Sequence, residues 1–121
     1  MKHHEFYISD WEASLDIYID NISSFSTQEL FYKEIITESL SNYIQGKELN
    51  DYIVKSDPIE TTVEEMKSFV YSSCFKSNKL FNEIITNKIE NIKIYHREWN
   101  NKEYIFNQNN NFIAVLWETT A

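Results

Sequence analysis

The chain has 121 residues, which fits one domain spanning residues 1–121 and leaves no room for two. Its 42% hydrophobic and 16% aromatic content is typical of a folded domain with its own core and excludes an intrinsically disordered chain. The net charge of −8 argues against direct binding of nucleic acid or of an anionic membrane. One cysteine excludes an intrachain disulfide and agrees with a reducing, cytoplasmic setting.

The negative charge is concentrated in the first half of the chain. Residues 1–65 carry 14 acidic and four basic side chains, whereas residues 66–121 carry five acidic and seven basic ones. An acidic half of this kind attracts a basic surface. The N-terminal residues lack an apolar core of signal-peptide length, and no stretch approaches the roughly 20 apolar residues that span a bilayer. We therefore expect a cytoplasmic protein without a membrane segment.

The first element along the chain is predicted to be a helix that Ser9 or Asp10 caps. Apolar side chains recur there at intervals of four, three and four residues, which is helical spacing. The stripe expected to face inward comprises Trp11, Leu15, Tyr18 and Ile22. The opposite side of this helix would carry Glu12, Asp16 and Asp20.

Four further segments have helical patterns. A capping-box sequence that begins at Ser26 predicts a second helix, and Gly46, the only glycine, suits its left-handed C-terminal cap. Pro58 ends the next segment, because the residue before proline avoids helical angles. The remaining helices are predicted over residues 47–55, after a cap at Thr61 or Thr62, and after residues 76–78.

After Asn91 the hydrophobic period changes from helical to alternating, which predicts strands. The segment 112–117 is apolar throughout and suits a strand that is covered on both faces. The expected strands cover residues 92–97, 103–106 and 112–117. The predicted fold is therefore α+β, with four or five helices followed by a C-terminal three-stranded antiparallel sheet.

The sequence contains no coherent catalytic motif. Cys74 with His96 could form half of a nucleophile site, but free cysteine is usually buried, which favours core filling. His3 and His4 could bind a metal with Glu5, but they lack helical ligand spacing, and a solvated tail is the favoured interpretation. One glycine cannot build a phosphate-binding loop. Carboxylate pairs are plentiful without a motif that selects one, so we expect no enzyme activity, metal or cofactor.

Repeated acids on the predicted helices are the strongest functional signal. Glu12, Asp16 and Asp20 are spaced at i, i+4 and i+8, and Glu34 with Glu38 repeats this spacing on the second helix. Like charges at i, i+4 cost about 0.2–0.5 kcal/mol per pair, so stability alone does not favour them. Either the acids only keep the protein in solution, or they form a binding surface for a cationic protein. On the second interpretation these five acids are the partner-binding residues.

The chain resembles bacterial toxin-immunity proteins of contact-dependent inhibition and polymorphic toxin systems. The resemblance rests on small size, acidity, the lack of catalytic residues and the C-terminal segment FIAVLWETTA. It implies a protein that binds one cognate toxin, often a basic nuclease, and covers its active site. Two alternatives remain: a nucleic-acid mimic that inhibits a restriction or interference enzyme, and a small enzyme or adaptor with an unrecognised site. An immunity gene should directly follow a toxin gene, which separates the first two classes.

Overall fold

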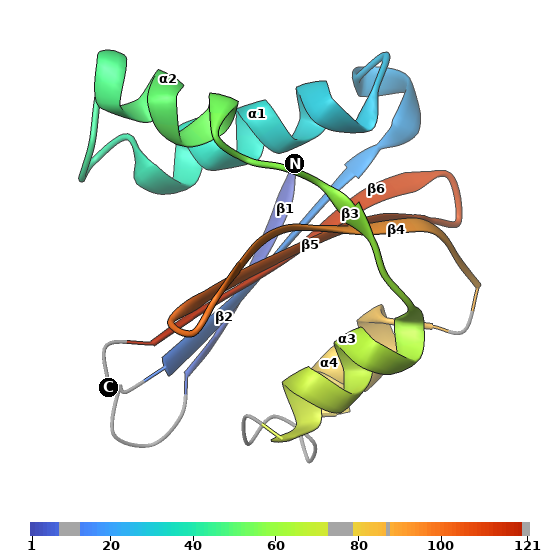
Figure 1. Cartoon of the computed structure of the whole chain (residues 1–121). Helices are drawn as coiled ribbons and strands as arrows, with labels where there is room; N and C mark the ends of the chain where they lie inside the picture. The colour runs from blue at the N-terminus through green and yellow to red at the C-terminus, as the bar shows by residue number, and fades with distance from the viewer. Residues whose placement is uncertain (8–12, 73–78, 87, 120–121) are drawn as a thin grey trace.

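The computed structural model describes residues 1–7, 13–72, 79–86 and 88–119, which form one six-stranded antiparallel sheet with helices on both faces. The strands are β1 (Lys2–Tyr7), β2 (Ala13–Asn21), β3 (Ile59–Glu60), β4 (Ile89–Glu98), β5 (Asn101–Gln108) and β6 (Asn111–Thr119). The α-helices are α1 (Gln28–Leu40), α2 (Lys47–Val54), α3 (Val63–Val70) and α4 (Lys79–Ile84). The strand order is β1-β2-β6-β5-β4-β3, and Figure 1 shows α1 and α2 on one face with α3 and α4 on the other.

The sheet corrects the predicted arrangement of the fold. The chain combines helices with an antiparallel sheet, as expected, but the expectation of a C-terminal three-stranded sheet after four or five helices is wrong. The C-terminal strands β4, β5 and β6 do form a meander, and β6 then pairs with β2 from the N-terminal part of the chain. The strand β6 is apolar on both faces because neighbouring strands flank it and helices cover it on both sides.

The predicted first helix is the strand β2. Its side chains alternate between the two faces of the sheet, with Leu15 and Ile17 in the core beneath α3 and α4. Asp16 and Tyr18 point to the opposite face, where Tyr18 packs into the core beneath α1 and α2. Helical spacing of the apolar residues was misleading here, because the same segment also alternates with period two and pairs along its full length with β6.

The N-terminal residues are also part of the sheet. The strand β1 pairs antiparallel with β2, from Lys2 opposite Ile19 to Tyr7 opposite Ser14. The prediction of a solvated tail at His3 and His4 is therefore wrong. The strand lies at the edge of the sheet, where its charged and polar residues suit an unpaired outer side.

Local signals placed most of the later elements. Thr62 caps α3 by accepting a hydrogen bond from the Glu65 amide, which confirms one of the two expected caps. The cap of α1 is Thr27 and not Ser26, and α1 ends at Leu40 before reaching Gly46. Gly46 does adopt a left-handed φ of 58°, but it precedes α2, which begins at Lys47 as expected.

Two hydrophobic cores, one on each face of the sheet, hold the helices in place. Beneath α3 and α4, the core includes Met66, Val70 and Phe81 together with the inward side chains of β2, β5 and β6. Beneath α1 and α2, the fully buried residues of α1 pack on Tyr18, Ile105 and Ala114.

Among the described residues, no helix is long and apolar enough to cross a membrane. Cys74 and Glu12 lie outside the described residues.

Candidate functional site

A pocket of about 470 Å³ opens between the sheet and the helices α1 and α2. Its apolar wall includes Ile36 and Leu40 of α1 and Leu116 of β6. Its polar lining comprises Asp16, Ser39, Tyr43, Tyr52, Asn101, Glu103 and Glu118. We call this site the acidic pocket, because three of its lining residues are carboxylates and none of the described residues that line it is a lysine, arginine or histidine.

Strand register brings the three carboxylates together from distant parts of the chain. Leu116 of β6 lies between its cross-strand partners Asp16 of β2 and Glu103 of β5. Glu118 lies two residues further along β6 on the same face, diagonal to both acids. Diagonal neighbours in an antiparallel sheet are about 7–8 Å apart, which is within the joint reach of long side chains. The three acids therefore lie on the same face of the sheet, where they line the acidic pocket.

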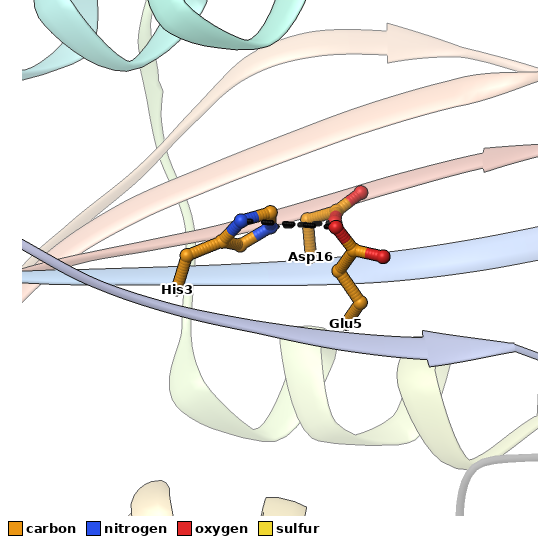
Figure 2. Close-up of side chains that lie close together, drawn as sticks. All are labelled: His3, Glu5 and Asp16. Atoms are coloured by element: carbon orange, nitrogen blue, oxygen red, sulfur yellow. Dashed lines mark hydrogen bonds and ion pairs between the residues drawn. The ribbon is translucent and has the colours of Figure 1, made fainter.

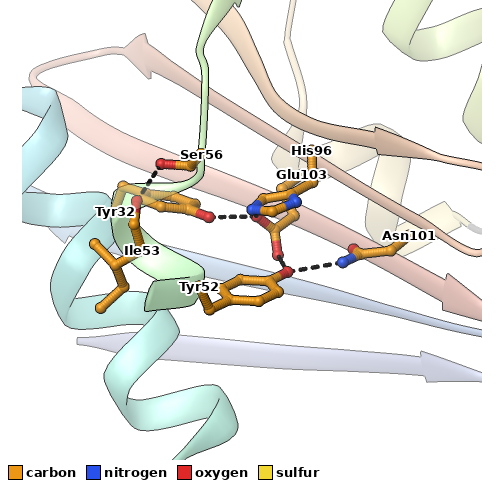
Figure 3. A network of polar contacts seen from close by, with 7 residues as sticks. All are labelled: Tyr32, Tyr52, Ile53, Ser56, His96, Asn101 and Glu103. Carbon is orange, nitrogen blue, oxygen red and sulfur yellow. Dashed lines mark hydrogen bonds and ion pairs between the residues drawn. The ribbon is translucent and has the colours of Figure 1, made fainter. Parts of the chain in front are cut away.

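Glu103 is the most buried of the three acids, with only 3% of its surface exposed. Tyr32 of α1 and Tyr52 of α2 each donate a hydrogen bond of 2.6 Å to one of its carboxyl oxygens, as Figure 3 shows. Asn101 in turn donates to the Tyr52 hydroxyl at 2.7 Å. This network ties α1 and α2 to the sheet through the carboxyl group of Glu103.

Among the described residues, His96 is the histidine that lies beside the carboxyl group of Glu103. Its Nε2 atom lies 3.8 Å from Glu103 Oε1, which is too far for a hydrogen bond but close enough for a charged ring to attract the carboxylate. The His96 ring stacks on Tyr52 with a centroid distance of 4.4 Å. His96 therefore lies against both Tyr52 and the Glu103 carboxyl group. The predicted pairing of His96 with Cys74 involves a residue that lies outside the described part of the chain.

Burial controls the ionisation of the pocket acids. Desolvation raises the pKa of Glu103, opposed by the His96 charge and by the tyrosine hydrogen bonds. Desolvation also raises the pKa of Asp16, opposed by its hydrogen bond with His3. The pKa values of Tyr32 and Tyr52 are raised by burial and by the nearby Glu103 carboxylate, so both hydroxyls remain donors at neutral pH. No lysine or arginine contributes to the pKa shift of either Asp16 or Glu103.

A cluster of His3, Glu5 and Asp16 borders the pocket at the edge of the sheet (Figure 2). His3 Nε2 lies 2.8 Å from Asp16 Oδ1, and His3 Nδ1 lies 3.9 Å from Glu5 Oε1. The ring also stacks on Tyr18 at 4.1 Å. These three groups have the chemistry of metal ligands, but a single ion can bind only one of the two ring nitrogens. One ligand atom from each of the three residues nevertheless lies within 4.8 Å of the other two, so one ion could contact all three side chains.

The structure places the acids that the sequence singled out in different environments. Asp16 lines the acidic pocket, although it projects from a strand and not from a helix. Asp20 lies near the end of β2 and accepts hydrogen bonds from Ser24 Oγ and from the Asn21 amide. Glu34 and Glu38 are exposed on α1, and the Glu38 charge acts on Tyr18 together with that of Asp16. Glu12 lies outside the described residues.

The sequence patterns did not single out Glu103, Glu118 or Tyr52 as site residues. The signal for Glu103 was present, because it is the one acid in the strand segment that runs through Tyr104 to Phe106. A charged residue beside buried strand residues is rarely fully buried without a partner.

Comparison of the chain with protein families, with curated proteins and with solved structures found no match.

The raised pKa of Glu103 predicts a pH dependence of stability. Because the pKa of Glu103 is higher in the folded state than its ordinary value of 4.5, the folded protein binds this proton more tightly than the unfolded chain does. The resulting contribution to the free energy of unfolding is complete below the unfolded pKa and is lost as pH rises through the folded pKa. To exclude titration of His96, the experiment compares His96→Gln with the double variant Glu103→Gln/His96→Gln. Between about pH 5 and pH 8, the free energy of unfolding of His96→Gln should fall relative to the double variant, by at most about 1.4 kcal/mol per pH unit. Urea denaturation measures both, and a difference that is constant or rises with pH would contradict the burial of this carboxyl group.

Proposed function

We propose that the chain is a cytoplasmic binding protein that neutralises a cognate basic protein toxin, such as a nuclease, by covering its active site. The observation that supports this proposal is the acidic pocket, which Asp16, Glu103 and Glu118 line without a lysine or arginine among the described lining residues. Asp16 and Glu103 have histidines as their cationic neighbours, and a permanent positive charge is absent from the described lining. A basic partner supplies the missing charge.

The overall charge of the molecule supports the same class of partner. A net charge of −8 on a domain of this size steers basic proteins toward it and repels anionic ones. Glu5 and Glu38 lie near Tyr18 together with Asp16, so negative charge surrounds one end of the acidic pocket. Charge of this kind raises the association rate with a cationic protein and weakens with salt. The resemblance to toxin-immunity proteins adds that this partner is a toxin.

Co-expression tests this proposal. The candidate partner is the C-terminal domain of the protein that the gene directly upstream encodes. This domain is produced in a host with and without the present chain. We expect the domain to arrest growth when it is produced alone and the chain to restore growth, with the two proteins co-purifying as a complex. Growth arrest that persists despite production of the folded chain, or an upstream gene that encodes no toxic domain, would refute the proposal.

A control separates neutralisation from a general effect of acidic protein. An unrelated immunity protein of similar size and charge, produced at the same level, should leave growth arrested because electrostatic attraction alone does not give specificity. Rescue by both proteins would mean that any polyanion protects the host, and this outcome also refutes a cognate pairing.

A further inference from the structure

We propose that the acidic pocket receives one lysine or arginine side chain of the bound partner, with its cationic group against Asp16, Glu103 and Glu118. This inference rests on the proposed function and names the site through which it would act. The pocket volume of about 470 Å³ falls within the range of pockets that enclose small ligands, so one long side chain has room to enter.

The lining of the pocket matches the two parts of such a side chain. Ile36, Leu40 and Leu116 provide an apolar wall for the methylene stem. The three carboxylates also line the pocket, where an ammonium or guanidinium group would make charge-assisted hydrogen bonds. Lysine and arginine are the protein side chains that combine an apolar stem with a permanent positive charge.

Tyr43 adds an aromatic surface at the mouth of the pocket. It lines the pocket although 82% of its surface is exposed, which is unusual for a large aromatic side chain in a protein that buries most of its aromatics. Tyrosine faces attract cations, and exposed tyrosines are frequent anchors in protein interfaces. Tyr43 would therefore contact the stem or the cation of the entering side chain.

Electrostatics favour a cation over a neutral group at this position. Tyr32 and Tyr52 donate hydrogen bonds to Glu103, and His96 and His3 lie beside Glu103 and Asp16, but none of the described lining residues is a lysine or arginine. Burial favours the protonated forms of Asp16 and Glu103, so an entering cation should release protons and bind more tightly as pH rises. His3, His96 and Glu5 are the other ionisable groups that lie beside these acids, and a positively charged histidine would compete with the entering cation.

The first test uses n-butylguanidinium as a probe and n-butylurea as its neutral isostere. Saturating addition of n-butylguanidinium to the ¹⁵N-labelled protein should shift the amide resonances of Ser39, Tyr43 and Asn101, and n-butylurea should not. Affinity for the cation should be higher at pH 8 than at pH 6, as expected for coupled proton release. Equal binding of the two probes, or shifts confined to residues outside the pocket, would overturn the proposal.

Matched variants localise the binding. The double variant Asp16→Asn/Glu118→Gln removes two charges from the pocket, and Glu64→Gln/Glu83→Gln removes two from α3 and α4 on the opposite face. We expect the pocket variant to bind n-butylguanidinium about tenfold or more weakly and the control variant to bind it normally. Equal weakening in both would show that only net charge matters and would overturn the proposal.

The outcome for the pocket is separable from the outcome for the proposed function. If the chain neutralises its toxin but n-butylguanidinium does not bind the pocket, the proposed function stands and this inference is wrong. If the pocket binds the cation but growth is not restored, the toxin proposal fails, and the deduction that a partner side chain enters the pocket fails with it. Both experiments use the full chain, and circular dichroism verifies that each variant is folded.

Discussion

Replacing Ile17 by alanine should lower the free energy of unfolding by about 2–5 kcal/mol, whereas Ile22→Ala should change it by about 0.5 kcal/mol or less. Ile17 is fully buried in β2 beneath α3 and α4, so its truncation removes buried methyl groups and leaves a cavity. Ile22 follows β2 and is 39% exposed, so truncation there removes little buried surface. The two changes are chemically identical and lie five positions apart.

This pair of variants discriminates directly between a strand and a helix at this position. In a helix with Leu15, Tyr18 and Ile22 inward, Ile17 would lie on the solvent side with the acids, and Ile22 would be part of the core. Urea denaturation of both variants, monitored by tryptophan fluorescence, measures the two changes. A larger loss for Ile22→Ala than for Ile17→Ala would contradict the six-stranded sheet.

Replacing Glu103 by alanine should destabilise the protein by about 3–5 kcal/mol, because a buried polar network loses its central acceptor. The hydroxyl groups of Tyr32 and Tyr52 would both remain beneath α1 and α2 without the oxygen atoms to which they now donate. Each unsatisfied buried donor costs about 1–3 kcal/mol, and the truncated side chain also leaves a cavity.

Glu103→Gln is the matched control, because glutamine keeps the shape of the side chain and one acceptor oxygen. We expect it to stay within about 1.5 kcal/mol of the unmodified protein at neutral pH, since it resembles the protonated acid that burial favours. Thermal and urea denaturation provide the comparison. If Glu103→Ala were as stable as Glu103→Gln, the network that joins both helices to the sheet would not contribute as the structure indicates.

Local patterns predicted the elements whose signals lie within a few residues. The threonine cap of α3, the start of α2 at Lys47 and the alternation of β4 are examples. The segment of β2 was ambiguous, because it satisfies a helical and a strand period at once. Its pairing with β6, from the far end of the chain, selects the strand, and no local pattern contains that information. The apolar β6 segment did require cover on both faces, which was correctly inferred.

The candidate site was only partly accessible from sequence. Asp16 was singled out for its spacing from Asp20, a spacing that places both on one face of a strand as well as of a helix. Glu103 and Glu118 could not be joined to Asp16, because their proximity depends on the register of three strands. Tyr52 enters from α2, whose position over the sheet is set by tertiary packing.

The affinity of this chain for its proposed partner, the candidate toxic domain encoded directly upstream, tests the central claim most directly. Isothermal titration calorimetry compares the unmodified chain with the pocket variant Asp16→Asn/Glu118→Gln and with the opposite-face variant Glu64→Gln/Glu83→Gln. We predict that the pocket variant binds about 30-fold or more weakly, because it removes two of the three carboxylates that would contact the partner cation, while the opposite-face variant retains its affinity. Unchanged affinity of the pocket variant, or an equal loss in both variants, would contradict the claim that the acidic pocket is the binding site.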